Sequence, residues 1–589
     1  MKATNREIAK ILYEISEILE IQNIPFKPRA YQKAAMTVDS LDRELSEIFI
    51  EGGIKAINEL PAIGASIAMK IVELLKTGKL KYFDKIKKNY PLNLTELTSI
   101  EGLGPKMAAR LFKELDIRNL EDLEKAAKAK KIRKLPDFGE KSEQNILRGI
   151  EFLKSSGDRM LLSDVLPVAE RIVSHLEKIK GVKKVIYAGS LRRMQETIGD
   201  IDILAISDDP KLIMEAFTDL AEVKEVYSRG KTRSSVRLLI GCDADLRVVP
   251  EKSFGAALQY FTGNKDHNVE MRKIAISKGY KLNEYGLFRG KKTIVSETEK
   301  EIYEKLSMDT PPPEIRNASG EIAAARFDSV KSRRAQKRAL PKLIGYSDIQ
   351  GDLQIQTSWT DGADSIEENA KAAQNMGYKY IAITDHTKSL AMTGGLDEKK
   401  IAEQGKEIDR LNKKFRGFKI LKSAEVNIMK DGSLDIENST LKKLDIVSAA
   451  VHSNFNMTRP EMTMRIIKAM KNPYLNILFH PTGRIINRRK GYDLDIDAII
   501  AAAKKYGVAL EIDAYPNRLD LKDEYIRKAV EAGVKLVIDT DAHDKSHLHF
   551  IKYGIAQARR GWAKKSDILN TKSADELLKA LKKLKKPAH

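Results

Sequence analysis

The stretch from Val185 to Ile206 constrains the fold more than any other part of the chain. Residues 185–188 and 201–206 are short apolar runs that predict two buried β-strands. Alternate residues of a strand share a face, so Asp200 and Asp202 are predicted to project together while Ile201 faces the core. Two carboxylates on one face repel each other. A divalent cation that prefers oxygen ligands, Mg²⁺ or Mn²⁺, is the simplest way to neutralise them.

Other residues around these strands extend the pattern. Asp245 lies in a later apolar run and adds a third carboxylate, with Arg247 on the same face. Gly189-Ser190 follows the first strand, where its N–H groups and hydroxyl are free to hold phosphate oxygens, and Arg192 and Arg193 add positive charge there. An Asp-x-Asp pair alone is typical of a solvated strand edge. The whole set resembles the nucleotidyltransferase palm, and in detail the family X DNA polymerases, the group of DNA polymerase beta.

That resemblance implies roles for named residues. The carboxylates of Asp200, Asp202 and Asp245 would hold two Mg²⁺ or Mn²⁺ ions. The segment 260–264 and the helix after it resemble the thumb of the family, in which Lys265, Asn268 and Arg272 share one helix face. The nucleotide-binding residues that the resemblance implies are Arg159, Gly189, Ser190, Arg193, Gly199, Tyr260, Phe261, Gly263, Lys265, Asn268 and Arg272.

A short pattern recurs three times before the palm, at residues 60–64, 100–104 and 135–139, and each copy ends in glycine before a helical stretch. A glycine turn that opens a helix aims free N–H groups at an anion. A single copy is typical of an ordinary helix hairpin. Three copies resemble the helix-hairpin-helix motif, which grips the DNA backbone without reading sequence, and imply DNA contacts at Gly64, Gly102, Gly104, Lys106 and Gly139.

The first copy also resembles the amino-terminal lyase domain of DNA polymerase beta. Lys70 falls at the position of its Schiff-base lysine, with Tyr31 and Lys27 at supporting positions that would also meet DNA. A lysine that loses its proton easily can attack a sugar aldehyde. Ser66 departs from the pattern, because the family has another lysine there. A helix lysine that binds DNA phosphate or solvent is an equally good interpretation.

From residue 346 onward, apolar strands alternate with helical stretches, which predicts a parallel α/β architecture. Four of the nine histidines stand just after these strands, where the ends of a β/α barrel form one face. The set resembles the PHP (polymerase and histidinol phosphatase) domain that bacterial and archaeal family X polymerases carry after the thumb. The implied ligands, for Zn²⁺ or Mn²⁺, are Asp361, His386, Glu425, His452, His480, Asp541 and His543.

The first metal motif of this domain departs from the family. Gln354 and Gln356 stand where the family has a His-x-His pair. A neutral amide oxygen is a much poorer ligand than imidazole for Zn²⁺ or Mn²⁺. One metal site is therefore predicted to be weak or empty, and any 3′-5′ exonuclease or phosphoesterase activity to be weakened.

The composition agrees with a DNA partner. The net charge of +21 over 589 residues favours a polyanion. Cys242 is the only cysteine, so an intrachain disulfide is excluded and a reducing compartment fits. The first 30 residues lack a signal-peptide layout, and no apolar run approaches the roughly 18 residues of a membrane span. We expect a cytoplasmic monomer that contacts gapped or primer-template DNA and dNTPs, and no membrane.

The expected fold is multidomain, α and α/β. We name the predicted regions by their residues: a lyase-like helical region with the first helix-hairpin-helix (1–90), a fingers-like region (91–155), a palm (156–250), a thumb (251–315), a linker (316–345) that holds the basic cluster 331–338, and a barrel-like PHP region (346–580). The expected function is template-directed polymerisation that fills short gaps in DNA repair. The alternatives are a template-independent nucleotidyltransferase, and a DNA-binding protein in which only the PHP region is a phosphoesterase or nuclease.

Overall fold

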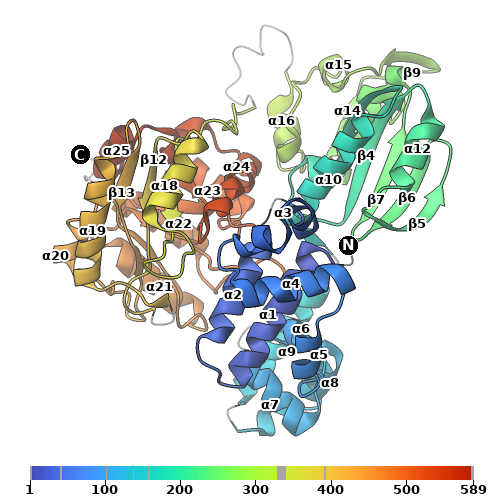
Figure 1. Ribbon diagram of the computed structural model, residues 1–589. Helices are drawn as coiled ribbons and strands as arrows, with labels where there is room; N and C mark the ends of the chain where they lie inside the picture. The colour runs from blue at the N-terminus through green and yellow to red at the C-terminus, as the bar shows by residue number, and fades with distance from the viewer. Residues whose placement is uncertain are drawn as a thin grey trace.

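The computed structural model describes residues 3–39, 41, 43–100, 103–136, 138–156, 159–327, 340–390 and 393–585. Gly102 and the basic cluster 331–338 lie outside the described residues. Figure 1 shows a helical N-terminal part in blue, a sheet with its helices in green, and a second α/β part in yellow to red. No helix within the described ranges is long and apolar enough to cross a membrane.

The N-terminal part consists of two small helical units. Around the first apolar core pack α1 (Asn5–Ile21), α2 (Lys27–Asp39), α3 (Leu45–Asn58), α4 (Ala65–Thr77) and α5 (Lys81–Lys87). The second core lies among α6 (Leu94–Leu97), α7 (Pro105–Leu115), α8 (Leu120–Lys128), η1 (Ile132–Lys134) and α9 (Glu140–Ser156). Ile8 and Leu12 of α1 are buried in the first core, whereas Ile18 is buried in the second. Because α1 contributes to both cores, the two units are packed together.

The palm is a five-stranded sheet in the order β2 (Val182–Tyr187), β4 (Asp200–Ser207), β7 (Asp243–Val248), β6 (Arg233–Leu238) and β5 (Val223–Arg229). Only β4 and β7 run parallel. The predicted strand 185–188 begins earlier, at Val182, and is an edge strand that is only partly buried. An edge strand can expose alternate side chains to solvent, which an apolar run by itself does not reveal.

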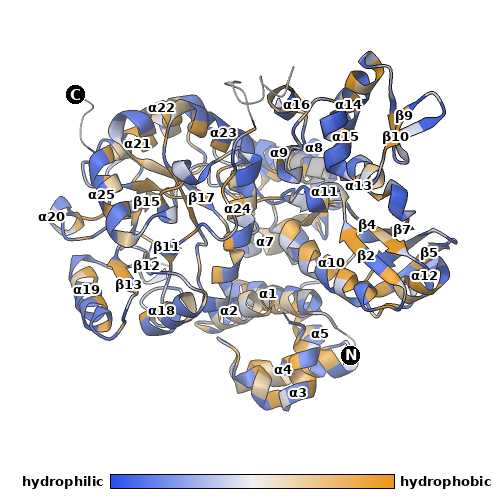
Figure 2. Ribbon diagram, turned by 90° about the horizontal axis from the view of Figure 1, so that it is seen from above, coloured by the Kyte–Doolittle hydropathy of each residue, from blue (hydrophilic) through white to orange (hydrophobic). Residues whose placement is uncertain are grey.

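Strand β4 decides where the carboxylates point. Ile201 and Ile203 enter the core beneath α10 (Leu162–Glu177) and α12 (Pro210–Thr218). Leu204 lies on the opposite face, against α13 (Phe254–Thr262). Asp200 and Asp202 have the same parity as Leu204, so they project from the α13 face before the apolar packing begins. Figure 2 shows β4 largely in the hydrophobic colour, next to helices that carry both hydrophobic and hydrophilic residues.

The thumb is built from helices and one small antiparallel sheet. Its sheet has the order β10 (Lys292–Val295), β9 (Gly286–Arg289) and β8 (Lys281–Asn283). Its helices after α13 are α14 (Lys265–Ser277), α15 (Glu299–Lys305) and α16 (Glu321–Ala325).

The predicted linker, 316–345, is wrong at both ends. Arg316 is buried and pairs with Glu299 at 2.5 Å, and α16 joins the thumb core. At the far end, Ile344 is buried in the PHP region. The proline run suggests a break, but Arg316 has a buried partner 17 residues earlier in the chain, and no local pattern reveals that pairing.

The PHP region is a barrel of parallel strands. A three-stranded sheet contains β11 (Gly351–Ile355), β12 (Tyr380–Ile383) and β13 (Lys419–Lys422), and a five-stranded sheet contains β14 (Glu425–Asn427), β15 (Ser448–Ala450), β16 (Ile477–Leu478), β17 (Ala509–Asp513) and β18 (Leu536–Asp539). Parallel bridges His386–Glu425 and Ile355–Ala542 join the two sheets. Leu353 and Phe479 point to the inner core. The larger helices outside the strands are α18 (Ile366–Asn375), α19 (Glu398–Asn412), α21 (Arg459–Met470), α22 (Ile496–Tyr506), α23 (Asp523–Ala532), α24 (Ile551–Arg560) and α25 (Ala574–Leu584).

A buried ionic contact ties the palm to the PHP region. Arg484 donates to the Glu196 carboxylate at 2.5 and 3.2 Å, and Gln557 Nε2 donates to it at 2.7 Å. Leu519 and Tyr553 of the PHP region enter the apolar core of the palm. Burial by itself raises the pKa of Glu196, but the charges of Arg484 and Arg560 hold that pKa below its ordinary value. The PHP barrel is therefore anchored beside the loop that precedes β4.

Candidate active sites

The three predicted palm carboxylates lie on neighbouring parallel strands. Asp202 of β4 is paired with Asp245 of β7 in the register of the two strands. Asp200 lies two residues before Asp202, on the same face of β4. Burial first, and then the charges of Asp200 and Asp245, raise the pKa of Asp202 to about 6. Crowded carboxylates of this kind favour a bound cation, which would restore the ionised form. Their all-oxygen donor set fits Mg²⁺ or Mn²⁺.

Asp245 is oriented by two residues of β6. Ser235, its register partner, donates its hydroxyl to Asp245 Oδ1, and Arg233 Nη2 donates to Oδ2 at 2.9 Å. Neither residue is predicted from the sequence. The alternation Arg233-Ser-Ser235 places them on one face, but only the antiparallel pairing of β6 with β7 brings them to Asp245.

The turn after β2 lies at the end of the palm site that is predicted to bind phosphate. Gly189 has φ +59°, and a Cβ there would stand 2.5 Å from Asp202 Oδ2, so only glycine allows this approach. The Ser190 hydroxyl is buried and has no hydrogen-bond partner in the described part of the chain. Arg193 lies nearby, where burial first and then the charges of Arg159 and Arg316 lower its pKa to about 10. An unpaired hydroxyl and concentrated positive charge beside the carboxylates suit an anionic phosphate.

The remaining palm arginines differ in availability. Arg159 donates from Nε to Thr197 Oγ1 at 3.0 Å, and a Cβ on Gly199 would stand 3.0 Å from its Nη1. Arg192 was expected to add charge at the phosphate end. Instead it pairs with Glu299 of the thumb at 2.7 Å, a partner 107 residues away, so its charge is neutralised.

The predicted thumb residues border the same end of the palm. A Cβ on Gly263 would stand 3.4 Å from Arg193 Nη1, and the Phe261 ring lies 4.8 Å from the Arg247 guanidinium. Tyr260 packs edge-to-face on Phe261 with ring centroids 5.2 Å apart. On α14, Lys265 and Arg272 are exposed. Asn268 is half-buried, and its amide donates to the Tyr260 carbonyl at 2.7 Å and accepts from Gln259 at 2.8 Å.

The three recurring glycines stand where helices begin. Gly64 and Gly104 are the N-cap residues of α4 and α7, and Gly139 precedes α9. A Cβ at any of the three would meet no atom within 4 Å, so packing inside the protein does not require glycine. Open helix N-termini suit close approach of an outside anion such as a DNA phosphate. Lys106, beside Gly104, donates to Asn23 Oδ1 at 2.7 Å.

Lys70 lies on α4 against two tyrosines. Its Nζ is 5.9 Å from the ring centre of Tyr31 and 5.1 Å from that of Tyr82, and it donates to the Ser66 hydroxyl at 2.9 Å. Burial, followed by the charge of Lys27, lowers the pKa of Lys70. Ser66, the departure from the family pattern, is thus a direct partner of this ammonium group.

In the PHP region the predicted ligands converge at the ends of the strands. Two groups of three residues could each hold a metal ion, and within each group the ligand atoms lie within 4.8 Å of one another. The first group contains Asp361, His386 and His543, and the second contains His386, Glu425 and His452. The two groups therefore share His386. His480 joins the second group through Nε2, 2.9 Å from Glu425 Oε1. Burial by itself raises the pKa of Glu425, but the charges of His386 and His452 hold that pKa well below its ordinary value. Mixed nitrogen and oxygen donors fit Zn²⁺ or Mn²⁺.

Gln354 and Gln356 occupy one side of the same centre. Their amide groups donate to Glu425 Oε2 at 3.3 and 2.7 Å, so the glutamines use a carboxylate oxygen that borders the histidines. Both Oε1 atoms are buried and have no hydrogen-bond partner among the described residues. Gln354 and Gln356 can therefore offer a cation only their neutral amide oxygens, whereas histidines would offer imidazole nitrogens.

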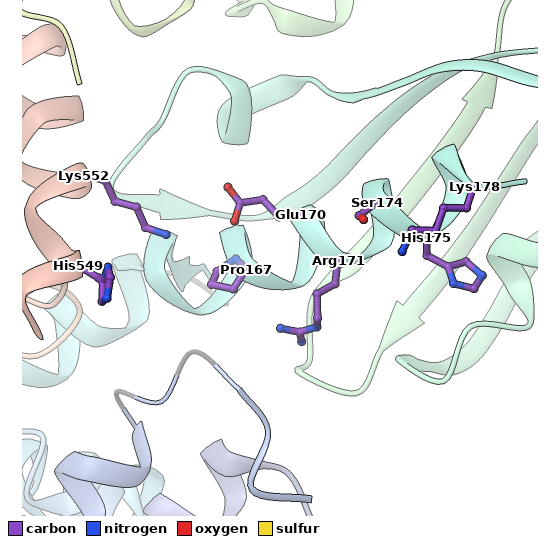
Figure 3. Close-up of a pocket in the computed structure, with 8 residues that line it drawn as sticks. All are labelled: Pro167, Glu170, Arg171, Ser174, His175, Lys178, His549 and Lys552. Atoms are coloured by element: carbon purple, nitrogen blue, oxygen red, sulfur yellow. The ribbon is translucent and has the colours of Figure 1, made fainter. Parts of the chain in front are cut away.

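One groove lies apart from the predicted site residues (Figure 3). It has a volume of about 580 Å³ and is lined by the outer face of α10, from Pro167 to Lys178, and by His549 and Lys552 of the PHP region. A second cavity, of about 260 Å³, includes Arg159, Thr197 and Glu196 at the border of the palm and the PHP region.

Comparison with known proteins gives family matches along most of the chain. Residues 3–80 match the helix-hairpin-helix domain, residues 94–151 the SAM-like helix-hairpin-helix tandem, residues 257–317 the DNA polymerase beta thumb, and residues 352–514 the PHP domain. A protein named DNA polymerase/3′-5′ exonuclease PolX, from Bacillus subtilis (strain 168), is 37% identical over 585 residues, which cover 98% of this chain and 99% of that protein.

Two shorter relatives match part of the chain. Proteins named "Probable phosphatase" from Thermoanaerobacter sp. (strain X514) and Caldanaerobacter subterraneus subsp. tengcongensis are 35% and 34% identical over 189 residues, which cover 30% of this chain and 72% and 70% of theirs. The full-length similarity, together with the helix-hairpin-helix, thumb and PHP matches, shows that the chain belongs to the family X DNA polymerases that carry a C-terminal PHP domain.

Proposed function

We propose that the protein extends a DNA primer on a template and fills short gaps during repair, as a monomer in the cytoplasm. The observation that carries the proposal is the trio Asp200, Asp202 and Asp245 on adjacent strands, next to the unpaired Ser190 hydroxyl. Two Mg²⁺ or Mn²⁺ ions on these carboxylates would supply the acidification of the primer 3′-hydroxyl and neutralise the leaving pyrophosphate. We assign Asp245 to the primer side, since only the ion there needs a third carboxylate.

The surrounding residues position the dNTP. We propose that Ser190, Arg193 and Arg159 bind its triphosphate. The positive charges of Arg159 and Arg316 near Arg193 support this proposal. Tyr260 and Phe261 would crowd the sugar, and the exposed Lys265 and Arg272 on α14 would meet the nascent base pair. Asn268 is hydrogen-bonded within the thumb, so its role would be to hold the Tyr260 segment in place.

Primer extension tests this proposal directly. Purified protein with Mg²⁺ or Mn²⁺ should add the templated dNTP to a duplex with a one-nucleotide gap, and should prefer this substrate to a nicked duplex. Equal incorporation of all four dNTPs would instead favour a template-independent transferase. No incorporation with either ion would overturn the assignment of the palm.

We further propose a lyase activity at Lys70, since its lowered pKa and its position against Tyr31 suit a Schiff-base nucleophile. Sodium borohydride should trap the protein on DNA that carries an abasic 5′-deoxyribose phosphate, and Lys70→Ala should abolish the adduct. Trapping that survives the substitution would assign the reaction to another amine.

For the PHP region we propose a metal-dependent phosphoesterase centre with weak 3′-5′ exonuclease activity. The name of the full-length relative supports an exonuclease, and the names of the shorter relatives support phosphate chemistry. The weakness follows from Gln354 and Gln356, whose amides engage Glu425 where the family has imidazole ligands. Strong nuclease activity that Asp541→Ala removes would contradict the expected weakness.

A further inference from the structure

A turn after β17 carries an arginine into the PHP centre. Arg518 Nε lies 3.5 Å from Asp513 Oδ2 and 3.5 Å from Asp541 Oδ2. Asp541 in turn lies 3.8 Å from His543, a member of the first ligand group. The guanidinium therefore lies beside the first group of candidate metal ligands.

The turn that presents Arg518 is firmly held. Arg518 N donates to the Tyr515 carbonyl at 2.8 Å, and the Asp520 carboxylate accepts from Thr482 N and Oγ1 at 3.0 and 2.9 Å. The Leu519 carbonyl accepts from Gln557 Nε2 at 3.2 Å, and Gln557 also binds Glu196 of the palm. Because both flanking residues are fixed, the Arg518 side chain is pre-organised at low entropic cost.

The hydrogen-bond donors of Arg518 remain unused. Within the described residues, its side chain makes only the two 3.5 Å ion pairs, and neither has hydrogen-bond geometry. A guanidinium that served only to neutralise Asp513 and Asp541 would be expected to form close, bidentate bonds with a carboxylate. Its side chain is 25% exposed, so its free N–H groups can be reached from outside the protein.

Within the described residues, the two ligand groups contain no guanidinium that could donate hydrogen bonds to an anion. Asp361, Glu425 and the histidines are ligands for cations, and the amide groups of Gln354 and Gln356 already bind Glu425. A phosphate group bound beside the cations also needs hydrogen-bond donors for its remaining oxygens, and the planar guanidinium fork matches them. We propose that Arg518 is the phosphate-binding residue of the PHP centre, acting on a phosphomonoester or on the phosphodiester of a nucleic acid end.

This inference rests on the proposed metal-dependent phosphoesterase centre and is independent of the polymerase site. It is tested by isothermal titration calorimetry on the full-length protein loaded with Mn²⁺, with two probes: inorganic phosphate, and the dinucleotide thymidylyl-(3′→5′)-thymidine for a phosphodiester. Arg518→Gln should weaken binding of one or both probes by a factor of about 10 to 100, the range for a charge-assisted hydrogen bond. The probe that is affected identifies the source of the phosphate.

Two further variants separate binding from structure. Arg518→Lys keeps the positive charge but lacks the planar guanidinium group, so it should bind the probes with intermediate affinity. If Arg518→Gln does not fold, the affinity of Arg518→Lys tests the proposal by the same criteria. Arg489→Gln is the matched control, since it removes a guanidinium of the same region that is engaged by the Gly483 carbonyl at 2.7 Å and by Phe455. It should bind both probes as the wild type does. Mn²⁺ content, measured by mass spectrometry, should be unchanged in all three variants.

Three results would overturn the proposal. Equal affinity of the wild type and Arg518→Gln for both probes would exclude Arg518 as a phosphate ligand while leaving the centre intact. Loss of Mn²⁺ together with phosphate affinity would show that Arg518 only shapes the metal centre. A wild-type protein that contains Mn²⁺ but binds neither probe would remove the proposed phosphoesterase centre itself, and the inference with it.

Discussion

Replacing Asp245 with asparagine should separate catalysis from folding in the palm. Asparagine has nearly the same shape, and its Oδ1 can still accept the hydroxyl of Ser235. The substitution weakens the ion pair between Asp245 and Arg233. The side chain of Asp245 is 28% exposed and that of Arg233 is 53% exposed. A pair this exposed contributes about 0.2–1 kcal/mol, so the stability of the palm should fall by no more than about 1 kcal/mol.

The cost to catalysis should be much larger. Asp245 faces Asp202 across parallel strands, where its charge helps raise the pKa of that carboxyl group. A cation between them would lose one of its three anionic ligands. We expect a loss of about 4 kcal/mol or more at the transition state, which corresponds to at least about a thousandfold fall in the rate of incorporation.

Single-turnover incorporation into a one-nucleotide gap measures this effect, with thermal unfolding and a DNA-binding titration on the same protein. The matched control is Asp243→Asn, which also weakens an exposed ion pair on β7, with Arg237 at 2.8 Å. The control should incorporate at nearly the wild-type rate. Wild-type incorporation by Asp245→Asn, or an equal loss in both variants, would refute the assignment of the third ligand.

Three other predictions follow from the same structure. Affinity for gapped DNA should fall steeply with salt and vary little with sequence, because we expect the open helix N-termini to contact backbone phosphates; a flat salt titration would contradict this. Because the pKa of Asp202 is about 6, a proton competes with the cation for this carboxylate at acid pH. Mg²⁺ affinity at the palm, measured by calorimetry, should therefore fall about tenfold for each pH unit below 6 and be constant above pH 6. An affinity that does not change from pH 5 to 7 would argue against Asp202 as a ligand. Gln354→His with Gln356→His should raise the Mn²⁺ content and the nuclease rate but leave polymerisation unchanged, and unaltered metal content would show that the glutamines do not limit the centre.

Local sequence pattern was enough to identify the candidate site residues. Alternation along β4 was enough to place Asp200 and Asp202 on one face, because side-chain direction in a strand has a period of two. Apolar strands followed by His386, His452 and His480 likewise predicted a ligand cluster, since parallel strands end at a common edge. These features depend on neighbouring residues alone.

Tertiary structure decided which distant residues meet. Ser235 reaches Asp245 only through the register of two antiparallel strands, and Arg192 is withdrawn from the phosphate end by Glu299, 107 residues away. The same is true of Arg518, whose partner Asp541 comes from a different strand end of the barrel. Such pairings depend on how strands and domains pack against one another, and the spacing of residues along the chain carries no record of that packing.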